Sequence, residues 1–320
     1  MYLRNITKEA LEAVERINPF VIKTPLEYSP LLSEVGSCNA FLKLENMQRT
    51  GSFKLRGAAN KIVSLNKEMI DKGIVTASSG NHGEAVAFMC RELGLSGTIY
   101  LPEYASKSKV DRLRPYGMNL VFRGDDCVQT EGVARQYARK NNLIYIPPYN
   151  DWKIIGGQAT IAIELADQLD RIDTVFVPVG GGGLIAGIAG YLKSAERGIE
   201  IIGCQPENSA VMFESIKAGK LVEIESLPTL SDGTAGGIEN GSVTLDLCRM
   251  LVDSFILVSE EEIKDAIKLI LNNHQILIEG AAALAVASFM KSEHRLEGKN
   301  TILIISGGKI SADQLKEVFG

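Results

Sequence analysis

Short apolar segments alternate with helix-like segments along most of the chain, and this alternation limits the fold more than any other feature. The apolar runs include GIVTAS, GTIYLP, DTVFVPV and NTILIIS, and each leads into a stretch with helical character. The runs are rich in valine and isoleucine and lack regular polar alternation, which is typical of strands buried on both faces. We therefore predict an α/β protein built on parallel sheets.

The length and charge of the chain narrow the classes of protein further. A chain of 320 residues is longer than one simple core usually holds, so two lobes are expected. The net charge of -5, with mixed signs, gives no basic surface for nucleic acid. The most apolar stretch, residues 174–192, is interrupted by Pro178 and a glycine run, so no membrane span is predicted.

The cysteines and histidines are scattered. There are 5 cysteines without a C-x-x-C pair, which favours reduced thiols and a cytoplasmic location. The 3 histidines are too dispersed for a recognisable zinc motif.

Three glycine-rich turns each follow an apolar run: SSGNHG at 78–83, GGGG at 180–183 and SGGK at 306–309. Ligands of open α/β sheets bind at the carboxyl ends of the strands, so the three turns are expected to converge on one ligand. In GGGG the absence of side chains lets backbone N–H groups crowd together, and a helix N-terminus follows. This favours a phosphate group, although the run does not match the nucleotide-binding P-loop. The alternative is a tight packing turn.

Lys54, in TGSFKLRG, is either a solvated surface charge or a nucleophile. A lysine amine together with a phosphate site is the combination that binds pyridoxal phosphate.

The loop SSGNHG suits a substrate carboxylate at a helix N-terminus, or serves only as a helix cap. His82 is a general base in one interpretation and a packing or capping residue in the favoured one. The hydroxyl of Ser306 would suit a neutral pyridine nitrogen.

Several segments, in the same order over nearly the full length, resemble one known family. They are LKLENMQRTGSFKLRGA, TASSGNHGEAVA, GGQATIAIEL, VPVGGGGLIAGIA, TLSDGTAGG, IEGAAALA and ISGG. The set resembles the fold-type II pyridoxal phosphate enzymes, in the serine/threonine dehydratase and serine racemase group. The resemblance implies a fold like the tryptophan synthase β subunit, in which two open, twisted parallel-sheet lobes hold pyridoxal 5′-phosphate in the cleft between them. Residues 1–66 and 149–320 would form the large lobe, and residues 67–148 a small mobile lobe.

The resemblance also assigns roles to particular residues. Lys54 would form the Schiff base with the cofactor, Phe53 would flank its ring, and Asn81 would bond its 3′-oxygen. The residues Ser78, Ser79, Gly80 and His82 would border the substrate carboxylate, and Ser79 would supply a second acid or base on the face opposite Lys54. The phosphate would be held by Gly180, Gly181, Gly182, Gly183 and Leu184, and the pyridine nitrogen would be met by Ser306.

The chain departs from the family pattern at a few positions. Glu84 stands where relatives usually have glutamine, and Lys309 where they usually have asparagine. In the turn QPENSAV, Gln205 replaces an acidic metal ligand of the metal-activated relatives, and Val211 stands near the second one. We therefore predict no intrinsic metal at this turn.

The resemblance implies elimination of water and ammonia from a β-hydroxy amino acid, with L-threonine or L-serine as the first expectation. Serine racemisation remains open because Ser79 matches the family's candidate second base. Dehydration of another substrate, such as 3-hydroxyaspartate, phenylserine or a compatible-solute breakdown product, also remains open. An anion-binding module without catalysis is the alternative of a different class. A homodimer is expected.

Overall fold

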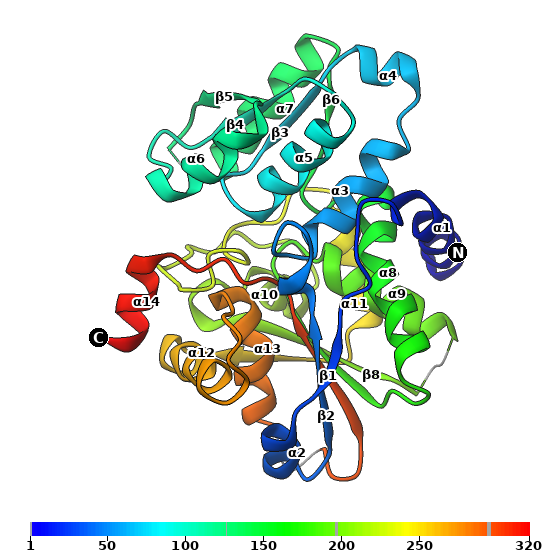
Figure 1. Cartoon of the computed structure of the whole chain (residues 1–320), viewed down its shortest axis with the longest axis vertical. Coiled ribbons are helices and arrows are strands. Elements are labelled where there is room, and N and C mark those ends of the chain that lie inside the picture. Colours follow the sequence, from blue (N-terminus) through cyan, green and yellow to red (C-terminus); the bar gives the residue numbers. More distant parts are fainter. Residues whose placement is uncertain (1, 126, 196–197, 293–295) are drawn as a thin grey trace.

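The computed structural model describes residues 2–125, 127–195, 198–292 and 296–320, which form two sheets with helices around them (Figure 1). Apart from the antiparallel pair β1–β2, all neighbouring strands in the two sheets run parallel. The predicted α/β class with parallel sheets is therefore confirmed. The larger sheet has the order β1 (Leu26–Tyr28), β2 (Asn39–Leu44), β10 (Asn300–Ile305), β7 (Thr174–Pro178), β8 (Glu200–Pro206), β9 (Ser254–Val258). The smaller sheet has the order β5 (Asn119–Phe122), β4 (Gly97–Leu101), β3 (Ile74–Ala77), β6 (Ile144–Tyr145).

Helices accompany each sheet. Those with the smaller sheet are α4 (Lys67–Asp71), α5 (Asn81–Glu92), α6 (Lys107–Leu113) and α7 (Cys127–Lys140). The helices with the larger sheet are α1 (Tyr2–Ile17), α2 (Pro30–Gly36), α8 (Trp152–Gln168), α9 (Gly183–Ala195), α10 (Val211–Lys217), α11 (Val243–Leu251), α12 (Glu260–His274), α13 (Gly280–Met290) and α14 (Ala312–Phe319). Helix α3 (Lys54–Val63) packs against both α8 and α5, and its buried apolar residues belong to the core of the smaller sheet. Both ends of the chain therefore lie with the larger sheet, and the smaller sheet is built from one continuous segment (Figure 1).

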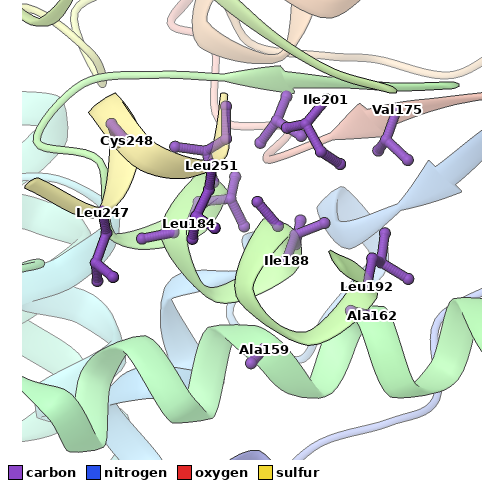
Figure 2. Packing of buried hydrophobic residues seen from close by; sticks show 14 of the residues in the cluster. Ala159, Ala162, Val175, Leu184, Ile188, Leu192, Ile201, Leu247, Cys248 and Leu251 are labelled. Carbon is purple, nitrogen blue, oxygen red and sulfur yellow. The ribbon is translucent and has the colours of Figure 1, made fainter. Parts of the chain in front are cut away.

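The larger sheet is buried on both faces, as its apolar strands predict. Successive residues of a strand point to opposite faces, so Val175 and Val177 of β7 enter one core and Phe176 enters the other. The first core packs α8, α9 and α11 against the sheet; Figure 2 shows Leu184, Ile188 and other apolar side chains of this core filling the space. The second core contains α12 and α13. This packing fixes the strand ends from which the glycine-rich turns emerge.

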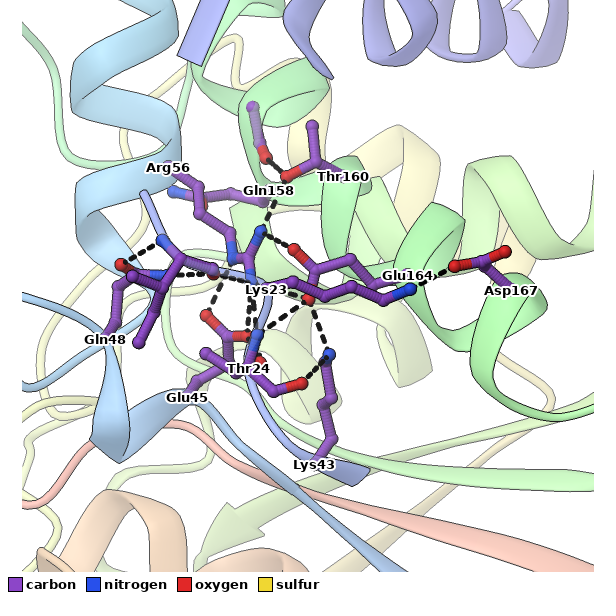
Figure 3. Close-up of polar contacts among 12 residues, drawn as sticks. Lys23, Thr24, Lys43, Glu45, Gln48, Arg56, Gln158, Thr160, Glu164 and Asp167 are labelled. Atoms are coloured by element: carbon purple, nitrogen blue, oxygen red, sulfur yellow. Dashed lines mark hydrogen bonds and ion pairs between the residues drawn. The ribbon is translucent and has the colours of Figure 1, made fainter. Parts of the chain in front are cut away.

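A buried cluster of charges lies beneath α3 (Figure 3). The guanidinium of Arg56 is fully buried and bonds Glu45 twice, at 2.8 Å from both Nε and Nη2, and also Glu164 at 2.6 Å from Nη1. Lys43 Nζ bonds the other oxygen of Glu164 at 2.6 Å. Burial opposes ionisation of Glu45, but the neighbouring cations outweigh it and lower the pKa of its carboxyl. The charges of two cations and two carboxylates thus cancel. Through Arg56 their ion pairs hold α3, the helix that begins at Lys54.

Among the described residues, no helix is long and apolar enough to cross a membrane.

Candidate active site

A cavity of about 500 Å³ lies where the carboxyl ends of strands from both sheets meet. The three glycine-rich turns all contribute to its lining, as the strand-end rule predicted. All residues that the sequence predicted for the cofactor and substrate site line this cavity: Phe53, Lys54, Ser78, Ser79, Gly80, Asn81, His82, Gly180, Gly181, Gly182, Gly183, Leu184 and Ser306.

Lys54 is the first residue of α3, and its side chain lines the cavity. Its Nζ donates a hydrogen bond to the carbonyl of Pro148 at 2.9 Å. Burial lowers the pKa of the amine to about 8, against the opposing pull of the Glu131 and Glu279 carboxylates. A lysine with this pKa is partly neutral near pH 7 to 8, which is the state that a nucleophile or base requires.

The turn before Lys54 is bonded to the loop that follows β10 of the larger sheet. Phe53 N donates to the carbonyl of Ser306 at 3.1 Å, and Ser52 forms an antiparallel bridge with Gly307. The loop carrying the lysine and the loop carrying Ser306 therefore keep a fixed spacing.

The glycine run sits at the N-terminus of α9, and Gly182 has a φ of +85°, which favours glycine. Our sequence reasoning expected a Cβ in this run to crowd the bound phosphate. The structure shows a second obstacle to a Cβ: at Gly181 it would lie 2.4 Å from the ring of Tyr149, and at Gly182 it would lie 2.8 Å from Met212 Cε. Side chains behind the loop exclude a Cβ, so the packing alternative applies to these glycines, and the phosphate interpretation stays a prediction.

Gly181→Ala is therefore expected to destabilise the protein even before cofactor binds. The methyl group would force the Tyr149 ring aside, and overpacking of this kind costs about 1–3 kcal/mol. The measurement is the denaturation midpoint of the cofactor-free protein. Gly132→Ala is the matched control, because a Cβ at this exposed position of α7 meets no atom within 4 Å. Equal midpoints for Gly181→Ala and the wild type would contradict the packing explanation.

The loop at 78–82 leads into α5, with Gly80 as the residue before the helix. Gly80 N donates to Ser78 Oγ at 3.2 Å, so the serine shapes the loop. Asn81 Nδ2 donates to Glu279 at 2.9 and 3.0 Å, whereas its Oδ1 is buried without a partner among the described residues. A buried amide with an unused polar atom in the cavity lining is suited to a polar ligand.

His82 lines the cavity, but its ring is bonded to the protein backbone. The ring is 3% exposed, and Nε2 lies 3.0 Å from the carbonyl of Ile146. Burial, together with the charge of Lys54, lowers the pKa of the imidazole to about 3. The ring is therefore neutral at ordinary pH and Nε2 donates to the carbonyl, which supports the packing interpretation over that of a general base.

Glu279 is a member of the site that sequence reasoning missed. It precedes α13, is 6% exposed, and accepts hydrogen bonds from Asn81 Nδ2 and from Lys309 N at 3.2 Å. Burial raises the pKa of its carboxyl above the ordinary value, despite the bond from Asn81. The available signal was a single carboxylate in the otherwise apolar segment ILIEGAAALAVA.

The end of β8 is hydrogen-bonded to the start of α10. Gln205 is 1% exposed, and its Oε1 accepts a hydrogen bond from Phe213 N at 2.8 Å. Val211 begins α10. The amide oxygen of Gln205, at the position of an acidic ligand in the metal-activated relatives, thus accepts a hydrogen bond from the backbone of α10.

Chelation is accordingly expected to leave activity within about twofold of the untreated enzyme, because magnesium and calcium require several oxygen ligands, carboxylates among them. The measurement is turnover after dialysis against EDTA, with and without added Mg²⁺ or Ca²⁺. A large loss that a divalent ion restores would contradict the prediction. Gln205→Glu provides a comparison, since it restores an acidic side chain at the turn.

The residues present fit pyridoxal phosphate. The cavity offers an amine of lowered pKa, a glycine loop at a helix N-terminus that suits a phosphate, and a buried amide with an unpaired oxygen. Two parallel-sheet lobes with this combination between them define an enzyme that carries pyridoxal phosphate as its cofactor. The family model described as "Pyridoxal-phosphate dependent enzyme" matches residues 17–308, and the chain belongs to this family.

Curated relatives and solved structures agree with the predicted family. The chain is 42% identical over 311 residues to L-threonine dehydratase catabolic TdcB of Staphylococcus aureus, covering 96% of this chain and 90% of the relative. It is 38% identical over 314 residues to L-threonine ammonia-lyase of Thermotoga maritima, covering 98% and 78% respectively. The processed threonine deaminase isoform 2 of Solanum lycopersicum superposes with a TM-score of 0.93 at 33% identity, over 99% of this chain and 87% of that one. Maize serine racemase superposes with a TM-score of 0.91 at 32% identity, over 98% and 96%.

Proposed function

We propose that this chain is a pyridoxal-phosphate-dependent ammonia-lyase that converts a β-hydroxy amino acid, first of all L-threonine or L-serine, to a 2-oxo acid and ammonia. One observation carries the proposal: the Lys54 amine, the loop at 78–82 and the glycine run line a single cavity. The similarity to a threonine dehydratase and a threonine ammonia-lyase over nearly the whole chain supports the same reaction.

The bound cofactor supplies an electron sink for the bond pair released at the substrate Cα. The chain's own groups position the substrate and move the protons. The N-terminus of α5, with Ser78 and Ser79, binds the substrate carboxylate. Lys54 Nζ removes the Cα proton, which its lowered pKa of about 8 allows at neutral to mildly alkaline pH.

The other cavity residues hold the reacting group in place. The glycine run at 180–183, with Leu184 and the N-terminus of α9, binds the cofactor phosphate. Ser306, which lines the cavity, would hold the pyridine nitrogen with a hydroxyl rather than a charged partner, and such a partner would leave that nitrogen neutral.

The segment 67–148 serves as a small domain that closes over substrate, and 1–66 with 149–320 forms the large domain. The smaller sheet and the loop at 78–82 both belong to this segment, so its movement would carry the carboxylate-binding loop.

The active form is a homodimer in the cytoplasm. The described cysteines are all free and buried, in keeping with a reducing compartment: Cys38, Cys90, Cys204 and Cys248.

A panel of β-hydroxy amino acids tests the reaction. The protein loaded with pyridoxal phosphate is incubated with L-threonine, L-serine, 3-hydroxyaspartate and phenylserine, and the 2-oxo acid and ammonia released are measured. Equal amounts of both products from L-threonine or L-serine are expected. A preference for another member of the panel would change the substrate, and no 2-oxo acid from any of them would overturn the proposed reaction.

Serine racemisation is the second candidate function. It requires an acid or base on the face of the substrate opposite Lys54, and the hydroxyl of Ser79 lines the same cavity. The similarity to maize serine racemase favours keeping this candidate.

Ser79→Ala distinguishes the two functions. The variant should lose D-serine elimination and serine racemisation, if the wild type has them, because a D-substrate presents its Cα proton to the Ser79 face. Elimination from L-serine should fall by no more than about ten- to a hundredfold, since Lys54 remains. Pyruvate release from each enantiomer and chiral analysis of the remaining serine provide the measurement. Equal loss on both enantiomers would mean that Ser79 only holds the carboxylate.

A further inference from the structure

The two departures from the family pattern beside the cavity, Glu84 and Lys309, meet in space. Lys309 Nζ lies 2.6 Å from Glu84 Oε2, although the residues are 225 positions apart. Glu84 belongs to the first turn of α5, three residues after Asn81. Lys309 ends the loop that begins at Ser306, beyond β10. The ion pair therefore joins the helix that carries the carboxylate loop to the larger sheet.

Lys309 also contacts the loop that carries the catalytic lysine. A Cβ at Gly51 would lie 3.1 Å from Lys309 Cε, so the lysine stem lies over this glycine. The backbone next to it is bonded twice: Gly308 N donates to the carbonyl of Gly51 at 3.1 Å, and Lys309 N donates to Glu279 Oε2 at 3.2 Å. Lys309 is thus in contact with the Lys54 loop, with Glu279 and with α5.

The burial of this pair separates it from the other ion pairs that connect the smaller sheet's segment to the rest of the chain. The side chains of Lys309 and Glu84 are 15% and 12% exposed. Those of Lys109 and Asp232 are 32% and 44% exposed, and those of Arg135 and Glu239 are 33% and 23% exposed. Exposed pairs contribute little because water and salt screen them, whereas a buried charge that loses its partner is costly.

Glu84 has two further neighbours on its own side of the cleft. Tyr116 OH donates to Glu84 Oε1 at 3.2 Å, and Arg112 Nε lies 3.9 Å from Glu84 Oε2. These contacts orient the carboxylate toward Lys309, but both partners belong to the same sheet segment as Glu84. Among the described residues, Lys309 is the partner of Glu84 that also contacts the Lys54 loop.

We propose that Glu84 and Lys309 are paired positioning residues that set the distance between the carboxylate loop at 78–82 and the Lys54 loop, and so determine substrate affinity. The inference deepens the proposed lyase function and rests on it for its kinetic readout. Neither side chain transfers a proton in the reaction. Their role is to hold two loops, each on a different sheet, in the arrangement that binds the amino acid carboxylate.

The test is a double-mutant cycle with Glu84→Gln, Lys309→Asn and the double variant, each loaded with cofactor. Each single substitution leaves one charge without its partner, so the KM for the amino acid should rise about tenfold with kcat changed less than twofold, the size of coupling expected for contacting charges. In the double variant neither side chain is charged, so no unpaired charge is left behind and its KM should fall below that of either single variant. Lys291→Asn is the matched control: it breaks the Lys291–Glu262 pair, 3.0 Å, which lies wholly within the larger sheet's segments.

Hydrogen exchange gives a readout that does not require turnover. In the cofactor-loaded protein without substrate, the backbone amides of residues 78–92 should exchange several-fold faster in each single variant than in the wild type or in Lys291→Asn. In the double variant they should return toward the wild-type rate. Additive effects of the two substitutions, or single variants with unchanged KM and exchange, would overturn the proposal. If no substrate is turned over, the exchange cycle still decides whether the pair positions the loop, so failure of the lyase function is seen separately.

Discussion

Lys54→Ala is expected to lower turnover by about a thousandfold or more, because it removes the proposed covalent anchor of the cofactor and the proposed base at the Cα proton. The visible absorbance of the lysine-bound cofactor should disappear as well. The fold should survive, since the bond from Nζ to the Pro148 carbonyl is the one hydrogen bond of this side chain in the described structure. The measurements are the absorbance spectrum, 2-oxo acid release and circular dichroism.

Lys309→Asn serves as the control for this experiment, because Lys309 lines the same cavity. It should keep the absorbance of the lysine-bound cofactor, while Lys54→Ala loses it. Normal turnover by Lys54→Ala, without an added amine, would be incompatible with the assignment of Lys54.

Arg56→Met should destabilise the protein by about 3–5 kcal/mol, which is the usual cost of removing one partner from a buried ion pair. The substitution leaves the buried Glu45 carboxylate without its bidentate partner and removes the 2.6 Å bond to Glu164. The denaturation midpoint of the cofactor-free protein measures the effect. Cofactor affinity should also fall, because Arg56 lies two residues after Lys54 in the first turn of α3.

Lys23→Met is the matched control for Arg56→Met. Lys23 pairs with Asp167 beside the same cluster, but the two side chains are 52% and 68% exposed (Figure 3). An exposed pair contributes about 0–1 kcal/mol, so this variant should unfold close to the wild type. Similar midpoints for Arg56→Met and Lys23→Met would mean that the buried cluster does not stabilise α3.

The sequence predicted the parallel sheets and the convergence of the glycine-rich turns because both follow from local patterns. The strand TVFVP is buried at every position and apolar after its first residue, Thr174, which is the local consequence of burial on both faces. Turns after parallel strands of one sheet lie at the same edge, so the approach of the turns after β7 and β10 could be predicted without coordinates. The third turn follows β3 of the smaller sheet, and the structure shows that it lines the same cavity. Roles assigned through the family motifs, such as that of Ser306, remain predictions for the experiments above.

Features that depend on the direction of a side chain could not be predicted in this way. The partners of Arg56 lie 11 and 108 positions away, and nothing local to KLRG indicates them. The contacts behind the glycines at 181 and 182 could not be predicted, because only the coordinates show that a Cβ would point toward Tyr149 and Met212. Glu84 and Lys309 were visible as two separate departures, and their contact emerged only from the fold.

The most direct test of the central claim is to locate the cofactor on the chain. The cofactor-loaded protein is reduced with borohydride, which makes the bond between lysine and cofactor permanent, then digested, and the modified peptide is identified by mass spectrometry. Modification of Lys54 alone, with one pyridoxyl group per chain, is the predicted result. Modification of Lys309 or another lysine in its place, or an active protein with no modified lysine, would contradict the account.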